Sequence, residues 1–276
     1  MSMLRVSRPI LTGCLLLMSL SSLLAQAVQA RHARVELLSA HLSPNQAWLG
    51  VHFSLEKDWH IYWVNPGDSG LPPVLKWQLP PGFKAGEIQW PLPEKLKRST
   101  LADYGYQDDV VLLVPLHIPA DFKKSGQAEI GLQAKWLICR EVCIADHAEL
   151  HLSGISSSLA PDQQKLLAEA KKRLPKPWPS SWKAGAASDK NSFVLSIQTG
   201  APVKAAEFFP LVPQQIENAA PQPLQPTEHG AKITLTKSDQ LLKPVRVLKG
   251  LLVLGNGESY QIRAPVAPTP TKADNN

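Results

Sequence analysis

Concentrated charge and long apolar runs are both scarce in this sequence of 276 residues. Lys and Arg number 29 against 23 Asp and Glu, and the longest basic run is Lys171 to Arg173. Binding to nucleic acid requires a basic patch or a known RNA-binding motif, so we expect no nucleic-acid partner. Beyond residue 30 no stretch is long and apolar enough to cross a bilayer, so we expect no membrane span in the mature chain. A glycine-rich phosphate loop and a Ser/His/Asp arrangement are also lacking.

The first thirty residues have the three-part layout of a secretory signal peptide. Arg5 and Arg8 give a positive start, residues 10–24 form an apolar stretch, and small residues end at Ala27 and Ala30. We predict a signal peptide over residues 1–30, cleaved after Ala30 with Ala27 as the second choice, and export to the periplasm. An uncleaved membrane anchor is the alternative, although serines interrupt the short apolar run.

Cysteine is rare, with three in the whole chain. Cys14 lies within the predicted leader, in a lipoprotein-like Leu11-Thr-Gly-Cys14 whose apolar run follows the cysteine instead of preceding it. Removal of the leader leaves Cys139 and Cys143 as an even pair in an oxidising compartment, where disulfides persist. Their bridge would close a loop of about five residues and stabilise the fold by roughly 2 kcal/mol. This is a weak structural reason for the pair, so the sequence favours reversible redox chemistry.

The pair stands in Trp136-Leu-Ile-Cys139-Arg-Glu-Val-Cys143-Ile, where one apolar strand ends and the next begins. We therefore expect a tight strand-to-strand loop, in which two α-carbons come within disulfide range. Arg140 would favour the thiolate of Cys139, whereas Glu141 would oppose it.

Two other interpretations of the pair stay open. The disulfide could be structural and pin a hairpin of a non-catalytic interaction protein. The thiolates could also bind Cu(I) together with His147, since Cys139, Cys143 and His147 are evenly spaced and thiolates suit soft metals. Copper-delivery proteins of the Sco type carry proline after the second cysteine, where Ile144 stands here. Our first expectation is therefore no metal, and His147 is more typical of a strand edge.

The 25 prolines separate short runs rich in Val, Ile, Leu, Trp and Phe, which is typical of an all-β chain. Residues 31–155 have the size of an immunoglobulin-like sandwich. The strands predicted there are 35–42, 47–55, 59–64, 74–79, 87–90, 110–118, 128–138 and 147–155.

A helical and proline-rich linker is predicted over residues 156–190, with a helix at 161–173 that ends before Pro175. A second, smaller β-sandwich is predicted over 191–266, and the tail at 267–276 should be disordered. The strands expected in the second domain are 192–199, 204–209, 231–236, 245–254 and 259–264.

Four segments of the first domain resemble a known family. They are Trp59-His-Ile-Tyr-Trp63-Val-Asn-Pro-Gly-Asp68-Ser-Gly-Leu-Pro-Pro73, Ile88-Gln-Trp-Pro91, Tyr104-Gly-Tyr106, and Trp136 to Cys143. Together they are similar to the periplasmic N-terminal domain of the thiol:disulfide interchange protein DsbD family, and most of all to its ScsB-like branch. The resemblance covers roughly residues 33–155.

The resemblance implies an immunoglobulin-like domain whose Cys139 and Cys143 relay electrons, with no bound cofactor. By resemblance Cys143 is the cysteine that attacks a substrate. The family shields its cysteines with a cap loop, which Asp103, Tyr104 and Tyr106 would form here, although the best-known members have phenylalanine where Asp103 stands. The cysteines are also separated by three residues, as in the ScsB-like branch, and not by five.

The resemblance also implies partners. Members of the family receive electrons from a membrane-embedded domain or a thioredoxin-like domain and reduce periplasmic thiol–disulfide proteins. We expect the donor to be a DsbD- or ScsB-type membrane protein on a separate chain. The protein would then be a thiol–disulfide oxidoreductase that depends on that donor.

Overall fold

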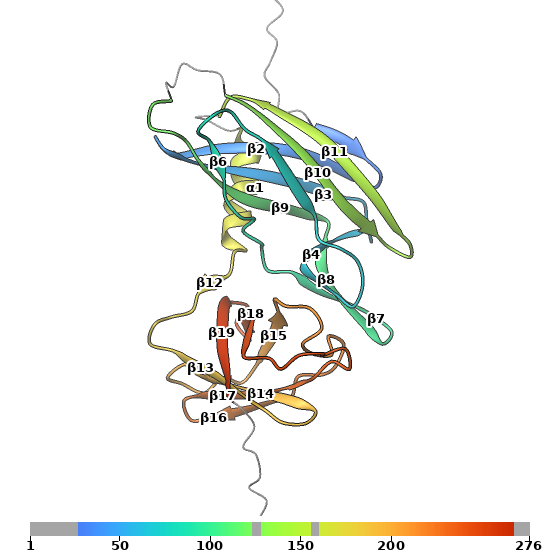
Figure 1. Ribbon diagram of the computed structural model, residues 1–276, viewed down its shortest axis with the longest axis vertical. Helices are drawn as coiled ribbons and strands as arrows, with labels where there is room; N and C mark the ends of the chain where they lie inside the picture. Colours follow the sequence, from blue (N-terminus) through green and yellow to red (C-terminus); the bar gives the residue numbers. More distant parts are fainter. Residues whose placement is uncertain (1–26, 123–127, 156–159, 268–276) are drawn as a thin grey trace, which may run out of the picture.

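The structure is a computed structural model that describes residues 27–122, 128–155 and 160–267. It contains two β domains, with the single described helix beside the first (Figure 1). Most of the predicted signal peptide and the predicted disordered tail lie outside the described residues.

The first domain is a sandwich of two antiparallel sheets, which confirms the immunoglobulin-like fold predicted for it. One sheet has the order β1-β2-β3-β9-β6, with bounds Ala27–Ala30, Ala33–Ser43, Gln46–Leu55, Asp109–His117 and Lys84–Ala85. The other has the order β11-β10-β4-β8-β7, with bounds Cys143–Ser153, Glu129–Cys139, His60–Gly67, Leu101–Gln107 and Glu94–Arg98. Strand β5 (Val74–Gln78) pairs with β10.

Strict alternation of side chains fills the core between these sheets. On β4, Ile61 and Trp63 point inward and are fully buried, so their neighbours His60 and Tyr62 point to the opposite face. The rings of Phe53 and Trp136 meet edge to face across the sandwich at 5.2 Å. The cysteine-bearing hairpin is thus positioned by a rigid, well-packed sheet.

Strand β1 lies inside the predicted signal peptide. Its four residues pair with β2 from Ala27↔Glu36 to Ala30↔Ala33. Cleavage after Ala30 would remove this edge strand, whereas cleavage after Ala27 would retain most of it. The cleavage site itself stays a prediction.

Helix α1 (Pro161–Lys172) packs on the first domain and is more than a connector. Leu167 and Ala170 are buried against Leu38, Val111 and Leu113 on the outer face of the β2-β3-β9 sheet. A side chain at Gly50 would collide with Leu167, so glycine at that position lets the helix approach the sheet.

The second domain has a continuous strand order, β15-β18-β19-β13-β14-β17-β16. Its two halves share one core that includes Phe193, Leu195, Phe208, Leu248 and Leu252. The bounds are Ala206–Pro210, Val247–Leu254, Ser259–Ala267, Lys183–Ser188, Ser192–Gln198, Gly230–Thr236 and Leu224–Thr227, and β12 (Lys176–Pro177) pairs with β19. Strand β13 falls within the predicted linker, so this domain begins before residue 191.

The two domains are in direct contact. Phe209 and Leu251 of the second domain join the core cluster of the first, and the Phe209 ring lies 5.4 Å from that of Tyr104. Lys95 Nζ is 3.1 Å from Glu207 Oε1 across the same boundary. Within the described residues, no helix has the length and apolarity needed to cross a membrane.

Candidate functional site

Cys139 and Cys143 form a disulfide across the end of the β10–β11 hairpin. Cys139 is the last residue of β10, as the sequence predicted, and the two α-carbons are 4.2 Å apart. The next strand was predicted to begin at residue 147, but β11 begins at Cys143 itself. The backbone N–H of Arg140 donates to the carbonyl oxygen of Val142 and closes the turn. The two cysteines differ in environment, because Cys139 is fully buried whereas Cys143 is exposed.

The disulfide lies on the face of the sheet that points away from the sandwich core. Cys139 is paired with His60, and the alternation on β4 places Tyr62 on the same face. On β8, Asp103 shares that face, since its neighbour Tyr104 points into the core. The side chains of His60, Tyr62 and Asp103 are nevertheless buried. This face of the sheet is therefore covered and forms a small polar cluster, separate from the apolar core.

Tyr62 is the aromatic residue in contact with the disulfide. Its hydroxyl lies 3.4 Å from Cys143 Sγ, and it donates the hydrogen bond because a disulfide sulfur carries no hydrogen. Gly70 (φ +82°) lies against the Tyr62 ring, and a Cβ at Gly70 would overlap it. Burial raises the pKa of Tyr62, so the phenol stays protonated and remains a donor.

The segment 65–73 that carries Gly70 is held by Asp103. The backbone N–H and the hydroxyl of Ser69 both donate to the Asp103 carboxylate, at 2.9 to 3.0 Å. Burial raises the pKa of Asp103, and the hydrogen bonds from Ser69 oppose this shift. Asp68 in turn accepts from the backbone N–H of Ala102 at 2.7 Å.

His60 is the second titratable residue beside the disulfide. It is 1% exposed, and its Nδ1 lies 3.4 Å from Nη2 of Arg98. Its Nε2 is buried and has no hydrogen-bond partner among the described residues. Burial, followed by the nearby Arg98 charge, lowers the pKa of His60 from 6.5 to about 4, so the imidazole is neutral at pH 7.

The three residues assigned to a cap loop lie in strand β8 and not in a loop. Tyr104 packs in the core against Trp63 and the second domain's Phe209, and the Tyr106 hydroxyl donates to the carbonyl oxygen of Pro91. Burial raises the pKa of both phenols. Of the three, Asp103 alone lies on the face of the sheet that carries the disulfide, and the capping role predicted for this set stays a prediction.

His60 and Tyr62 were not predicted from the sequence as site residues. Period-two alternation was the available signal, because it assigns Ile61 and Trp63 to the core and leaves their neighbours on the opposite face. Which strand lies beside the cysteines cannot be read from that pattern.

The two charged residues of the hairpin turn, Arg140 and Glu141, are both exposed. The Arg140 guanidinium lies over the Trp59 ring, 5.3 Å from its centroid, and Trp59 stacks on His32 at 3.8 Å. The cation–π contact fixes the turn residue that follows Cys139.

The structure does not assemble the copper site that was left open. His147 lies four residues along β11 from Cys143, which at about 3.3 Å per residue puts the two α-carbons about 13 Å apart. Among the described residues no three His, Cys, Asp or Glu side chains form a group that could hold a metal ion.

Exposed apolar side chains surround the disulfide hairpin. Leu71, Val74 and Val142 are each more than half exposed. Leu71 and Val74 line a groove of about 620 Å³ together with Pro72, Trp136, Leu137 and His147. An apolar surface next to an exposed sulfur is suited to contact with another protein.

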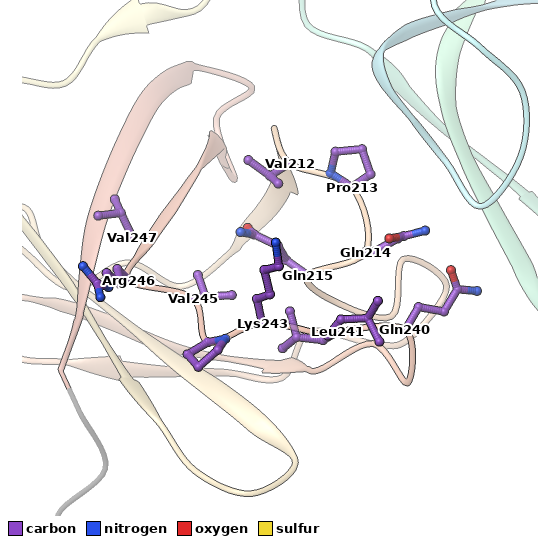
Figure 2. A pocket seen from close by; sticks show the side chains of 12 residues that line it. Val212, Pro213, Gln214, Gln215, Gln240, Leu241, Lys243, Val245, Arg246 and Val247 are labelled. Atoms are coloured by element: carbon purple, nitrogen blue, oxygen red, sulfur yellow. The ribbon is translucent and has the colours of Figure 1, made fainter.

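A second pocket, of about 450 Å³, lies in the second domain between residues 212–215 and 240–247 (Figure 2). Apolar and amide side chains line it, with Lys243 and Arg246, and none of its lining residues is a cysteine, histidine or carboxylate. None of the residues singled out in the sequence lies there.

The fold and site define a class: a two-domain β protein whose first sandwich ends in a disulfide hairpin with one buried and one exposed sulfur. Residues 25–153 match the family model described as "Thiol:disulfide interchange protein DsbD, N-terminal". The first domain is therefore similar to this family over nearly its whole length. No curated protein matches the sequence.

A solved structure extends the similarity to both domains. The crystal structure of the N-terminal periplasmic domain of ScsB from Proteus mirabilis superposes with a TM-score of 0.66 at 17% identity. The match covers 86% of this chain and 94% of that one. The two proteins therefore share the fold of the sandwich and of the second β domain.

Proposed function

We propose that the protein relays electrons in the periplasm by reversible opening of the Cys139–Cys143 disulfide. Cys143 forms the mixed disulfide with a partner, and Cys139 is the resolving cysteine. The observation that carries this assignment is the difference in burial, because a partner can reach the exposed sulfur of Cys143 but not the buried sulfur of Cys139.

Reduction proceeds in two balanced steps. A partner thiolate attacks Cys143 Sγ, the Cys139–Cys143 bond breaks, and its electron pair leaves on Cys139 Sγ. The partner's second thiolate then attacks the partner's first sulfur in the mixed disulfide. This forms the partner's disulfide and releases Cys143 as a thiolate. Two electrons and two protons pass from the partner dithiol to this protein, and the reverse sequence, begun by the Cys143 thiolate, reduces a substrate disulfide.

The partners we propose are a membrane-embedded donor of the DsbD or ScsB type and periplasmic thiol–disulfide proteins. The apolar side chains of Leu71, Val74 and Val142 around the hairpin support contact with such proteins. The match of residues 25–153 to the DsbD N-terminal family model supports the same chemistry.

Redox equilibration with glutathione or a dithiol buffer tests the proposal against a purely structural disulfide. A structural disulfide has a reduction potential below about −300 mV, whereas a relay requires a less negative value. A measured potential below that limit would overturn the proposal.

Trapping tests the roles of the two cysteines. A purified thioredoxin-fold protein whose own resolving cysteine is replaced is first activated as a mixed disulfide with thionitrobenzoate. The Cys143 thiolate of Cys139→Ser should displace thionitrobenzoate from it and form a stable mixed disulfide. Cys143→Ser should not, because its remaining thiol is buried. Equal trapping by both variants would contradict the assignment.

A further inference from the structure

The side chain of His60 has an unusual position for a residue outside the redox pair. It is the cross-strand partner of Cys139, and directly opposed residues of antiparallel strands have Cβ atoms about 4.5–5.5 Å apart on the same face. Both side chains are fully buried. His60 also meets the ring of Tyr62 edge to face at 5.1 Å, and Tyr62 contacts the other sulfur.

The hydrogen-bond partner of Nδ1 fixes where the imidazole carries its hydrogen. A guanidinium has donors and no acceptor, so Nδ1 of His60 accepts from Arg98. The hydrogen of the neutral ring is therefore on Nε2. This N–H group is buried and unpaired in the disulfide form, which costs free energy, so a state of the protein that supplies an acceptor is favoured by the hydrogen bond gained.

Opening of the disulfide creates such an acceptor next to the ring. When a partner attacks Cys143, the bond electrons leave on Cys139 Sγ, which becomes a buried thiolate free to rotate about its χ1. A buried anion without a hydrogen bond is strongly disfavoured. We propose that His60 donates its Nε2–H to the Cys139 thiolate and so stabilises the leaving group of the exchange reaction.

Other charged groups lie near His60 and Tyr62. Arg98 from β7 favours the thiolate, and the Asp103 carboxylate on β8 disfavours it, while Tyr62 on β4 stays protonated beside Cys143. Among these groups, His60 is the one that pairs with Cys139 in the sheet and has an unused donor. This inference deepens the proposed function and rests on it for its biological meaning.

The test measures the thiol pKa of Cys139 in isolation. In reduced Cys143→Ser, thiolate absorbance at 240 nm is followed as a function of pH with His60, His60→Gln and His60→Phe. Glutamine retains an N–H donor and does not titrate, whereas phenylalanine removes the donor. A hydrogen bond to a charged group is worth about tenfold in an equilibrium constant. We expect the thiol pKa to rise by about one unit in His60→Phe and to be largely restored in His60→Gln.

Two controls keep the test decisive. His151→Gln, at an exposed position on β11, should leave the pKa of Cys139 unchanged. If His60→Phe does not fold, the ¹⁵N NMR signal of His60 Nε2–H in the otherwise unchanged protein should shift downfield when the disulfide is reduced. At a pH high enough for Cys139 to be ionised in both proteins, the same tenfold effect should lower the reduction potential of His60→Phe by about 30 mV.

The possible outcomes separate this inference from the proposed function. Equal thiol pKa values in the proteins with His60, His60→Gln and His60→Phe would overturn the role of His60. So would an Nε2–H signal that does not shift when the disulfide is reduced. A low thiol pKa that depends on His60, in a protein whose disulfide is structural by redox titration, would support the hydrogen bond and overturn the relay.

Discussion

The side-chain amide of Asn65, in the first domain, donates a hydrogen bond to the carbonyl oxygen of Pro210 in the second, at 2.7 Å. Both residues are buried. The Oδ1 atom of Asn65 also accepts from the backbone N–H of Gly67. Asp68, three residues after Asn65, accepts a hydrogen bond at 2.6 Å from the side-chain amide of Asn218 in the second domain. The segment 65–73, which holds Gly70 against Tyr62, is therefore anchored on both domains.

Asn65→Ala should lower the free energy of unfolding by about 1–3 kcal/mol, because it leaves the buried Pro210 oxygen and the Gly67 N–H without their partner. Urea denaturation measures the loss. Asn256→Ala is the matched control, since Asn256 also makes two side-chain hydrogen bonds but is exposed. Equal losses in the two variants would show that the buried contact between the domains contributes no more to the free energy of unfolding than an exposed hydrogen bond does.

Gly70→Ala should make the disulfide easier to reduce, because the new methyl group displaces the Tyr62 ring from Cys143. The observable is the rate of reduction by dithiothreitol. Gly257→Ala separates this effect from backbone strain, since its φ of +85° is similar but a Cβ there meets nothing within 4 Å. Each change should cost about 1–2 kcal/mol from the left-handed backbone. An unchanged reduction rate in folded Gly70→Ala would contradict the shielding role of Tyr62.

Acid should destabilise the protein through His60. Its pKa is about 4 in the folded state and 6.5 as the ordinary value, so between these pH values the unfolded chain binds a proton that the folded chain does not. The stabilisation is fully present above pH 6.5 and is lost as the pH falls towards 4. Urea midpoints should fall less over this interval in His60→Gln than in the unchanged protein, whereas exposed His147→Gln should follow the unchanged protein. Parallel pH profiles for all three would refute the prediction.

Leu167→Ala should cost about 2–4 kcal/mol, because it opens a cavity between helix α1 and the β2-β3-β9 sheet. Leu166, which is partly buried beside it, provides the comparison, and Leu166→Ala should cost clearly less. Denaturation curves of the two variants test whether the helix belongs to the folded first domain. A free linker helix would tolerate both changes equally.

The sequence predicted the parts of the fold that have strong alternation. Strands β2, β3, β9 and β10 follow their predicted ranges closely, and the cysteines were placed correctly at the two ends of a hairpin turn. The helix was also predicted, but its packing was not, because its apolar positions Leu167 and Ala170 do not reveal which surface covers them.

The β7–β8 hairpin shows why other elements were missed. Strand β7 reads Glu94-Lys-Leu-Lys-Arg98, a charged edge strand with little apolar signal. Residues of β8 were assigned to a cap loop by family resemblance. A Cβ at Gly105 would collide with the carbonyl oxygen of Ile61 on β4, so glycine permits close strand pairing there. Likewise, segment 87–90 was predicted as a strand and forms a single bridge, Gln89↔Leu113. A contact between residues as far apart in the sequence as Asp68 and Asn218 cannot be predicted from the local pattern of side chains.

The double anchoring of segment 65–73 has a consequence for how this protein can be divided. A fragment that stops at the end of the first sandwich would lack Pro210 and Asn218, and the ring that shelters Cys143 would lose its outer support. Truncation or transplantation of the first domain should therefore retain residues 207–218, since thiol reactivity measured on a shorter piece would describe a different chemical environment.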